Sequence, residues 1–136
     1  MNKSNSTSSL FYVFYGAKSV PSNKPEALKN IPIIVWLQGG PGASSLMGML
    51  FEMGPYGLRQ KENSSDYEEI NRTNSWNQNY SMLFVDQPIG TGASYAADLN
   101  EIPQNQAQAA QHLYNGLQEF FRLPCSVNLT KTDLSV

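Results

Sequence analysis

Cysteine and histidine are nearly missing from this chain, which has 136 residues and one of each, Cys125 and His112. A single cysteine excludes an internal disulfide, a cysteine-based zinc site and a paired-thiol redox centre. An excess of one charge is missing too, because nine Lys and Arg face eleven Asp and Glu, for a formal net charge of −2. This balance argues against nucleic acid as a partner, since a nucleic-acid surface is strongly basic. We expect neither a metal ion nor a cofactor.

Long hydrophobic runs are absent as well. The longest, residues 10–17 and 31–37, are far shorter than the roughly 20 apolar residues of a membrane-spanning helix, so no membrane span is predicted. Residues 1–9 are polar. We expect them to form a flexible N-terminus rather than a secretory signal, which would need an apolar segment followed by small residues.

Strand and helix patterns alternate along the rest of the chain. Residues 31–37 are continuously apolar, the pattern of a strand buried on both faces of a parallel sheet. Residues 104–121 place apolar side chains at helical spacing, which indicates an amphipathic helix. The expected strands are residues 10–15, 31–37 and 82–85, and the expected helices are residues 44–53 and 104–121. Residues 59–80 are polar and are interpreted as an exposed excursion. This order indicates a single α/β domain over residues 1–136.

A glycine-rich turn, residues 39–42, separates the apolar strand from the helix that follows. As a phosphate loop the turn is a poor match, because it has no lysine and Pro41 lacks a backbone N–H. As a dinucleotide turn it lacks the third small residue of that motif. An oxyanion hole fits better, since a buried strand that ends in paired glycines offers a preorganised N–H. A tight turn with no ligand is an equally good interpretation of the glycines alone.

A candidate nucleophile is Ser94, in the segment Gly-Ala-Ser-Tyr-Ala at residues 92–96. It resembles the G-x-S-x-G elbow, but its fifth residue is alanine and no helix pattern begins directly after it, so we interpret it as a decoy. His112 is expected on the solvent face of its helix, in line with Gln108, Asn115 and Glu119. Because the chain has no second histidine, no Ser-His-Asp triad can be assembled inside these 136 residues.

Asn-x-Ser/Thr triplets occur at Asn2, Asn5, Asn63, Asn71, Asn79 and Asn128. Several fall in the polar excursion, where N-linked glycans would fit if the chain enters the secretory route. A sequence rich in Asn and Ser also makes such triplets by chance, so they are weak support for a secretory protein.

Four motifs in a fixed order resemble the N-terminal third of a serine carboxypeptidase. They are PIIVWLQGGPGASS at residues 32–45, FEMGPY at 51–56, SWN at 75–77 and DQPIGTGASY at 86–95. Gln38, where many members have asparagine, resembles the vitellogenic-like branch. The resemblance covers about residues 10–121. It implies an α/β-hydrolase fold, of which this chain would hold the N-terminal part of the mixed sheet with its flanking helices. It also implies the release of single residues from peptide C-termini, at acid pH in lysosomes, vacuoles or the secretory route.

The resemblance also assigns roles to particular residues. The backbone N–H of Gly40 would form half of the oxyanion hole. Trp36, Gln38, Gly39 and Glu52 would bind the C-terminal carboxylate of the peptide substrate. The expected partner is therefore the C-terminus of a peptide, and the resemblance implies no nucleic acid and no cofactor.

The sequence also departs from the family. Ala43 stands where many members have a disulfide cysteine, and residues 122–136 do not follow the family pattern. The G-E-S-Y-A-G elbow and the later catalytic Asp and His are absent from these 136 residues. We therefore expect a truncated segment that is inactive by itself. Two alternatives are a non-catalytic peptide-binding or degenerate paralogue and a small nucleotide-binding α/β domain. An in-frame elbow in the neighbouring coding sequence would favour the enzyme.

Overall fold

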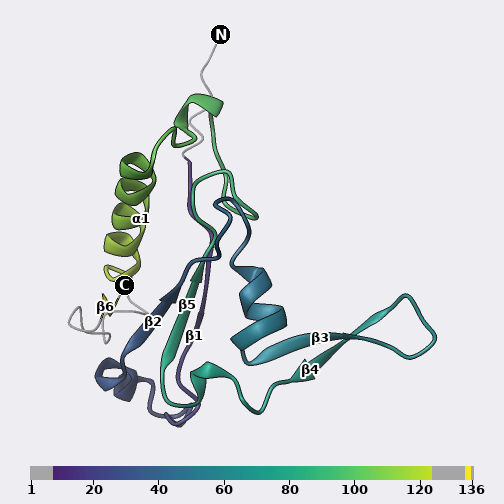
Figure 1. Ribbon diagram of the computed structural model, residues 1–136. Helices are drawn as coiled ribbons and strands as arrows, with labels where there is room; N and C mark the ends of the chain where they lie inside the picture. The colour runs from purple at the N-terminus through teal and green to yellow at the C-terminus, as the bar shows by residue number, and fades with distance from the viewer. Residues whose placement is uncertain (1–7, 124–133, 136) are drawn as a thin grey trace.

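A mixed sheet forms the centre of the computed structural model, which describes residues 8–123, 134 and 135 (Figure 1). The strand order is β1-β5-β2-β6. The strands are β1 (Tyr12–Tyr15), β2 (Ile33–Trp36), β5 (Ser81–Val85) and β6 (Leu134–Ser135). Strand β1 runs antiparallel to β5, whereas β2 is parallel to both β5 and β6. The predicted strands at 10–15, 31–37 and 82–85 are confirmed, with ends that differ by one or two residues.

The central strand β5 is buried on both faces, and its side chains alternate between two hydrophobic clusters. Leu83 and Val85 pack with Phe120 of the long helix on one face. Met82 and Phe84 pack with Met49 and other residues of the helix after β2 on the opposite face. The sheet is thus the middle of three layers, as Figure 1 shows. Burial on both faces explains why this strand has no polar alternation in its sequence.

The long helix, α1 (Gln106–Phe120), covers one face of the sheet. Asn105 caps its first turn, because the Asn105 side chain accepts a hydrogen bond of 3.0 Å from the backbone N–H of Gln108. Phe120 anchors its last turn against Tyr12 and Phe14, with ring centroids 5.3 and 5.6 Å away. The predicted helix at 104–121 is confirmed.

The predicted α-helix at 44–53 differs from the structure. Only residues 46 and 47 are α-helical, and η2 (Gly48–Met53) is a π-helix. Its last turn shows the wider spacing, because the N–H of Gly54 donates to the carbonyl of Met49, five residues earlier, at 3.1 Å. Segments of π-helix are rare and are frequently found at functional sites. The apolar spacing alone could not separate the two helix types.

The polar excursion at 59–80 contains regular structure that the sequence analysis missed. A two-stranded antiparallel hairpin joins β3 (Tyr56–Gln60) to β4 (Tyr67–Asn71), and it projects away from the sheet (Figure 1). Its side chains are mostly exposed, as expected, whereas Ser75 and Asn77, later in the same predicted excursion, are buried. The pattern was hidden because a hairpin without a buried face shows little apolar alternation.

Short helical turns connect the remaining elements. They are the 3-10 helices η1 (Pro25–Asn30), η3 (Trp76–Gln78) and η4 (Leu99–Glu101). Within the described residues, the helices are too short or too polar to cross a bilayer.

The two predicted terminal segments lie mostly outside the described residues. Of the N-terminus at 1–9, the structure describes Ser8 and Ser9, and the flexibility of the segment stays a prediction. Ser9 pairs with Tyr95 through two backbone hydrogen bonds, and the Ser8 hydroxyl bonds to Glu101 and Ala97. Of the divergent tail at 122–136, the structure describes only Arg122, Leu123 and the two residues of β6.

Candidate functional site

The glycine-rich turn lies at the carboxyl end of the parallel strand β2, where the sequence predicted it. Gly40 and Gly42 have φ angles of 124° and 99°, which side chains rarely adopt. Residues 39–42 are all exposed. The turn therefore presents its backbone to the solvent in a conformation that glycine alone adopts without strain.

A buried carboxylate, that of Asp86, holds this turn in place through hydrogen bonds. Asp86 directly follows β5 and is 1% exposed. Its Oδ1 accepts hydrogen bonds of 2.7 Å from both the Ser45 backbone N–H and the Ser44 hydroxyl. Its Oδ2 accepts a bond of 2.9 Å from the N–H of Ala93. Asp86 thus connects the segment after the glycine-rich turn with the loop after β5.

Ser45 makes the second set of bonds that fix the turn. Its hydroxyl donates to the carbonyl of Val85 at 2.5 Å and accepts from the N–H of Gln38 at 3.0 Å. The side chain is 1% exposed. The bonds of Ser45 and Asp86 tie both sides of the exposed glycines to β5, so the turn is preorganised by buried polar contacts.

Trp36 and Gln38 lie side by side at the end of β2. The indole N–H of Trp36 donates to Oε1 of Gln38 at 2.9 Å. This bond fixes the Gln38 amide, and within the described residues its Nε2 group donates to no acceptor. Because Gln38 is half-buried, its free N–H groups are available to an acceptor from solvent such as a carboxylate.

The helix after the turn passes directly over this pair. A Cβ atom at Gly48 would lie 2.5 Å from Nε1 of Trp36 and 2.9 Å from Oε1 of Gln38, so a larger residue does not fit. Glu52 lies four residues further along the same π-helix. It is exposed and makes no hydrogen bond or ion pair within the described residues. The structure therefore brings Trp36, Gln38, Gly39 and Gly40 together and places Glu52 one turn along the adjacent helix.

The helix is held at its other end by Arg72, which sequence reasoning missed. The guanidinium donates to the carbonyls of Leu50 at 3.0 Å, Gly54 at 2.7 Å and Tyr56 at 3.1 Å. The contacts with Leu50 and Gly54 satisfy carbonyls that the end of a helix leaves without partners, and the contact with Tyr56 reaches the start of β3. The only available signal was one of two arginines in a polar segment, which is uninformative without the fold.

Ser94 is buried and bonded to the main chain. Its hydroxyl donates to the carbonyl of Asp86 at 2.6 Å and accepts from the N–H of Phe11 at 2.8 Å. These bonds join the loop after β5 to the start of β1, so Ser94 has a structural environment rather than that of a nucleophile. The phenol of Tyr15 lies at the other end of β1 from Ser94, and burial raises its pKa, with Tyr56 and Glu69 adding to the shift.

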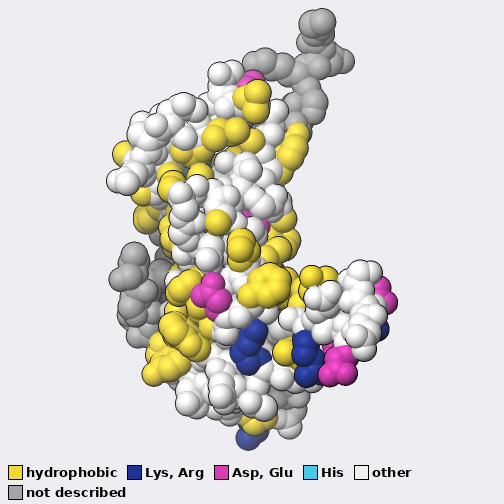
Figure 2. Space-filling view, turned by 45° about the vertical axis from the view of Figure 1, so that its right-hand side comes forward, with side chains coloured by type: hydrophobic (Ala, Val, Ile, Leu, Met, Phe, Trp, Pro, Cys, Tyr) yellow, Lys and Arg dark blue, Asp and Glu magenta, His cyan; other side chains and the backbone are white. Residues whose placement is uncertain are grey.

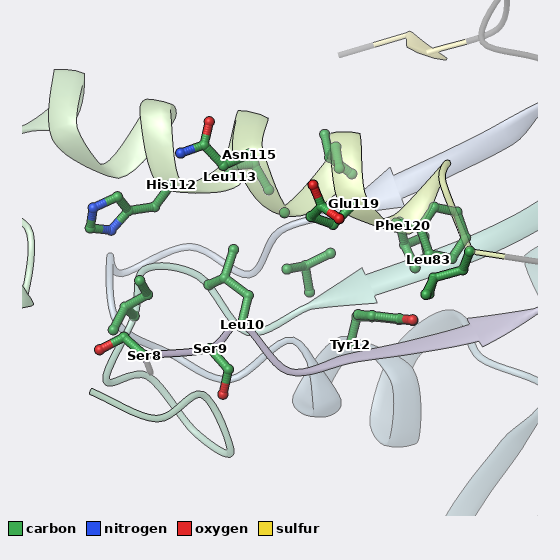
Figure 3. Close-up of a pocket in the computed structure, with 15 residues that line it drawn as sticks. Ser8, Ser9, Leu10, Tyr12, Leu83, His112, Leu113, Asn115, Glu119 and Phe120 are labelled. Carbon is green, nitrogen blue, oxygen red and sulfur yellow. The ribbon is translucent and has the colours of Figure 1, made fainter. Parts of the chain in front are cut away.

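His112 is not on the solvent face, and that prediction is wrong. It lines a cavity of about 390 Å³ between α1 and the sheet, where Figure 3 shows it near Ser8, and its Nδ1 is buried without a hydrogen-bond partner. The reason is Gly116, where a Cβ would lie 2.9 Å from Leu10. The close approach of Leu10 turns the helix so that the row of residues 112, 116 and 120 faces the sheet.

The mixed sheet, with a glycine-rich turn at the carboxyl end of a parallel strand, places the chain among α/β proteins. A sequence profile described as serine carboxypeptidase matches residues 1–131, and the chain belongs to this family. Its fold is part of the α/β-hydrolase fold.

Particular relatives refine the comparison. Serine carboxypeptidase-like 50 of Arabidopsis thaliana is 45% identical over 113 residues, which is 83% of this chain and 24% of the relative. The vitellogenic carboxypeptidase of Aedes aegypti is 38% identical over 116 residues, covering 85% and 22%. The crystal structure of Kex1Δp, a prohormone-processing carboxypeptidase from Saccharomyces cerevisiae, superimposes with a TM-score of 0.67 at 28% identity. The match covers 87% of this chain and 24% of that one. The chain thus spans about a quarter of the length of these relatives.

Proposed function

We propose that the protein is a serine-type carboxypeptidase in which this chain supplies half of the oxyanion hole and the subsite for the substrate's C-terminal carboxylate. The observation that carries the proposal is the Trp36–Gln38 bond of 2.9 Å beside the glycine turn. It occupies the oxygen of the Gln38 amide and leaves the amide N–H groups for a carboxylate. In this proposal the N–H of Gly40 stabilises the negative charge that develops on the scissile carbonyl.

Three further residues complete the proposed subsite. The Trp36 indole orients the Gln38 amide, and the backbone of Gly39 contacts the carboxylate. Glu52 shares a proton with the substrate carboxylate, because two carboxyl groups at hydrogen-bond distance cannot both stay ionised at low cost. Peptide binding should therefore be strongest in acid, which fits action in a lysosome, a vacuole or the secretory route.

A binding measurement on the 136-residue chain tests the subsite. The fluorescence of Trp36 and Trp76 is followed while an N-acyl dipeptide with a free C-terminus, or its amide, is added. Loss of a hydrogen bond to a charged group costs about 1.5–3 kcal/mol, or roughly ten- to a hundredfold in affinity. Gln38→Ala should weaken binding of the acid by this factor and leave the amide unchanged. Gln111→Ala, an exposed glutamine on α1, is the matched control.

The pH dependence of the same titration tests Glu52. Binding of the free acid should weaken as the pH rises and the shared proton is lost, the behaviour of a coupled pair. Glu52→Gln should remove most of this dependence. Equal losses on acid and amide in Gln38→Ala would mean that Gln38 merely supports the glycine turn, and the subsite would have to be abandoned.

A chimaera tests turnover. The segment of the Arabidopsis relative that matches this chain is replaced by the corresponding residues of this chain, and release of C-terminal amino acids is measured. Labelling by a fluorophosphonate shows that the chimaera is folded and its serine reactive. Binding to the isolated chain without turnover in a labelled chimaera would favour the non-catalytic peptide-binding alternative.

A further inference from the structure

Trp76 is a half-exposed tryptophan between two buried residues. It begins the 3-10 turn η3, in the connection that leads from the hairpin to β5. Ser75 and Asn77, on either side of it, are each 3% exposed, whereas Trp76 is 49% exposed. Figure 2 shows hydrophobic side chains at the surface beside the hairpin. A side chain that stays half in water gains only part of the free energy of burial, so core packing alone does not explain a tryptophan here.

Hydrogen bonds of the two neighbours hold this turn in place. The Nδ2 group of Asn77 donates to the carbonyl of Gly16 at 3.1 Å, and the carbonyl of Asn77 accepts from the N–H of Lys18 at 2.7 Å. The Ser75 hydroxyl accepts a bond of 3.1 Å from the ammonium group of Lys18. These bonds tie the turn to the segment after β1. The backbone of Trp76 is thus fixed from both sides, which limits the rotamers that its indole can adopt.

The indole of Trp76 contacts that of Trp36 edge to face. The ring centroids are 6.2 Å apart and the ring planes are at 80° to each other. Aromatic pairs prefer this arrangement because the positive edge of one ring meets the negative face of the other. Trp36 is the residue whose indole N–H donates to Oε1 of Gln38 at 2.9 Å. The Trp76 ring therefore packs on the donor of the bond that orients the Gln38 amide.

The Trp36 indole is restricted at two places. At its N–H edge the backbone of Gly48 is so close that a Cβ atom there would lie 2.5 Å from Nε1. The contact with Trp76 restricts rotation of the ring. Without the second ring, the Trp36 indole could turn and release Oε1 of Gln38. The freed amide could then rotate and present its oxygen, an acceptor that repels a carboxylate, in place of its N–H groups.

We propose that Trp76 is a positioning residue for the carboxylate subsite. It acts through Trp36 rather than by touching the substrate, because it holds the indole that keeps the oxygen of the Gln38 amide occupied. The amide N–H groups then stay directed at the carboxylate. The inference rests on the proposed carboxylate subsite. Loss of an edge-to-face ring contact changes an equilibrium constant about two- to tenfold, and binding of the free acid should weaken by this factor.

Calorimetric binding of an N-acyl dipeptide acid and of its amide to the 136-residue chain tests this role. Trp76→Ala should reduce the ratio of acid affinity to amide affinity about two- to tenfold. A loss of stability alone would lower both affinities and leave their ratio unchanged, because both ligands bind the same folded fraction. Trp76→Phe keeps an aromatic edge and should retain most of the ratio, whereas Trp76→Leu should not. Tyr80→Ala removes a 46% exposed ring from the same connection and is the matched control.

A double-variant cycle separates action through the Gln38 amide from an independent effect of Trp76. In the Gln38→Ala chain the amide is already gone, so adding Trp76→Ala should leave the acid-to-amide ratio where Gln38→Ala alone puts it. A further fall of the ratio in the double variant would overturn the positioning role. A Trp76→Ala chain with the wild-type ratio would overturn it as well. If Trp76→Ala does not fold, Trp76→Leu takes its place in the cycle.

Hydrogen exchange of the Trp36 indole N–H tests the geometry without a ligand. The chain has two tryptophans, so each Trp76 variant shows the signal of Trp36 alone in ¹H–¹⁵N spectra. This N–H should exchange with water faster in Trp76→Ala than in Tyr80→Ala, and as fast as in Gln38→Ala, where its acceptor is missing. Equal exchange rates in Trp76→Ala and Tyr80→Ala would remove the role of Trp76 alone. An unchanged acid-to-amide ratio in Gln38→Ala would instead remove the carboxylate subsite, and this role with it.

Discussion

The glycine-rich turn and the β3–β4 hairpin are both exposed connections, yet the chain holds them in opposite ways. The exposed glycines of the turn are tied to β5 by the buried side chains of Asp86 and Ser45. The hairpin is held mainly by its own backbone pairing, with the exposed ion pair Arg59–Glu68 across it. The difference indicates that the backbone geometry is fixed at the turn, whereas the hairpin can tolerate substitutions. A fixed backbone suits a binding site, and a tolerant one suits an exposed surface.

Removing the buried carboxylate should have the largest effect. Asp86→Ala leaves three donors, from Ser44, Ser45 and Ala93, without their acceptor. We expect the free energy of unfolding to fall by at least about 3 kcal/mol, since each bond to a charged group contributes about 1.5–3 kcal/mol. Urea denaturation measures the loss. Asp66→Ala, at an exposed position of the hairpin connection, should cost under about 0.5 kcal/mol. Equal losses of unfolding free energy in Asp86→Ala and Asp66→Ala would contradict the difference between the fixed turn and the tolerant hairpin.

The second-largest loss of stability is expected from a substitution that crowds the carboxylate of Asp86. Gly92 has φ of 55°, and a Cβ atom there would collide with the carboxylate of Asp86. Gly92→Ala should therefore cost about 2–3 kcal/mol in thermal or urea unfolding. Gly39→Ala is the control, because nothing lies within 4 Å of its added methyl group. A Gly92→Ala chain as stable as the Gly39→Ala chain would show that the loop after β5 adjusts freely.

Loss of Arg72 should be somewhat milder, because its guanidinium is only partly buried. Arg72→Ala leaves the carbonyls of Leu50, Gly54 and Tyr56 to water, and we expect a loss of about 2 kcal/mol. Arg72→Lys should recover part of it, since an ammonium cannot reach three carbonyls with the same geometry. Full recovery with lysine would assign the effect to charge alone. Hydrogen exchange of the η2 amides follows the helix end directly.

The smallest effect is expected across the hairpin. The ion pair of Arg59 and Glu68 is 2.5 Å long, but its side chains are 67% and 38% exposed. Exposed pairs contribute between about 0 and 1 kcal/mol. Glu68→Ala should therefore change the free energy of unfolding by less than about 0.5 kcal/mol, and added salt should reduce even that. A loss comparable with that of Arg72→Ala would mean that the hairpin is anchored along its whole length.

The buried elements were predictable from the sequence because their patterns are local. Strands β2 and β5 are short apolar runs, and α1 has helical spacing and a capping Asn105. The turn between β2 and η2 was predictable because four small residues interrupt an apolar strand. The serine carboxypeptidase family was predictable from motif order, which physical pattern alone does not supply.

The features that were not predicted depend on contacts between distant residues. Asp86 acts on Ser44 and Ser45 across about forty residues of chain, and Arg72 acts on a helix end. His112 faces the cavity because Gly116 admits Leu10, a contact that no helical wheel contains. The roles of the predicted site residues stay predictions, because they concern a substrate and not a contact within the chain; these residues are Gly40, Trp36, Gln38, Gly39 and Glu52.

The place of β5 in the sheet also governs how the chain folds during synthesis. Strand β5 lies between β1 and β2, although it follows both in the sequence. Strand β2 ends at Trp36 and β5 begins at Ser81, so at about 5–20 residues per second a ribosome needs several seconds to supply the partner. During that time two apolar strands lack their central neighbour, and the long loop between β2 and β5 makes their later closure slow. Co-translational chaperones that shield short apolar segments would find their first target here, well before any active site exists.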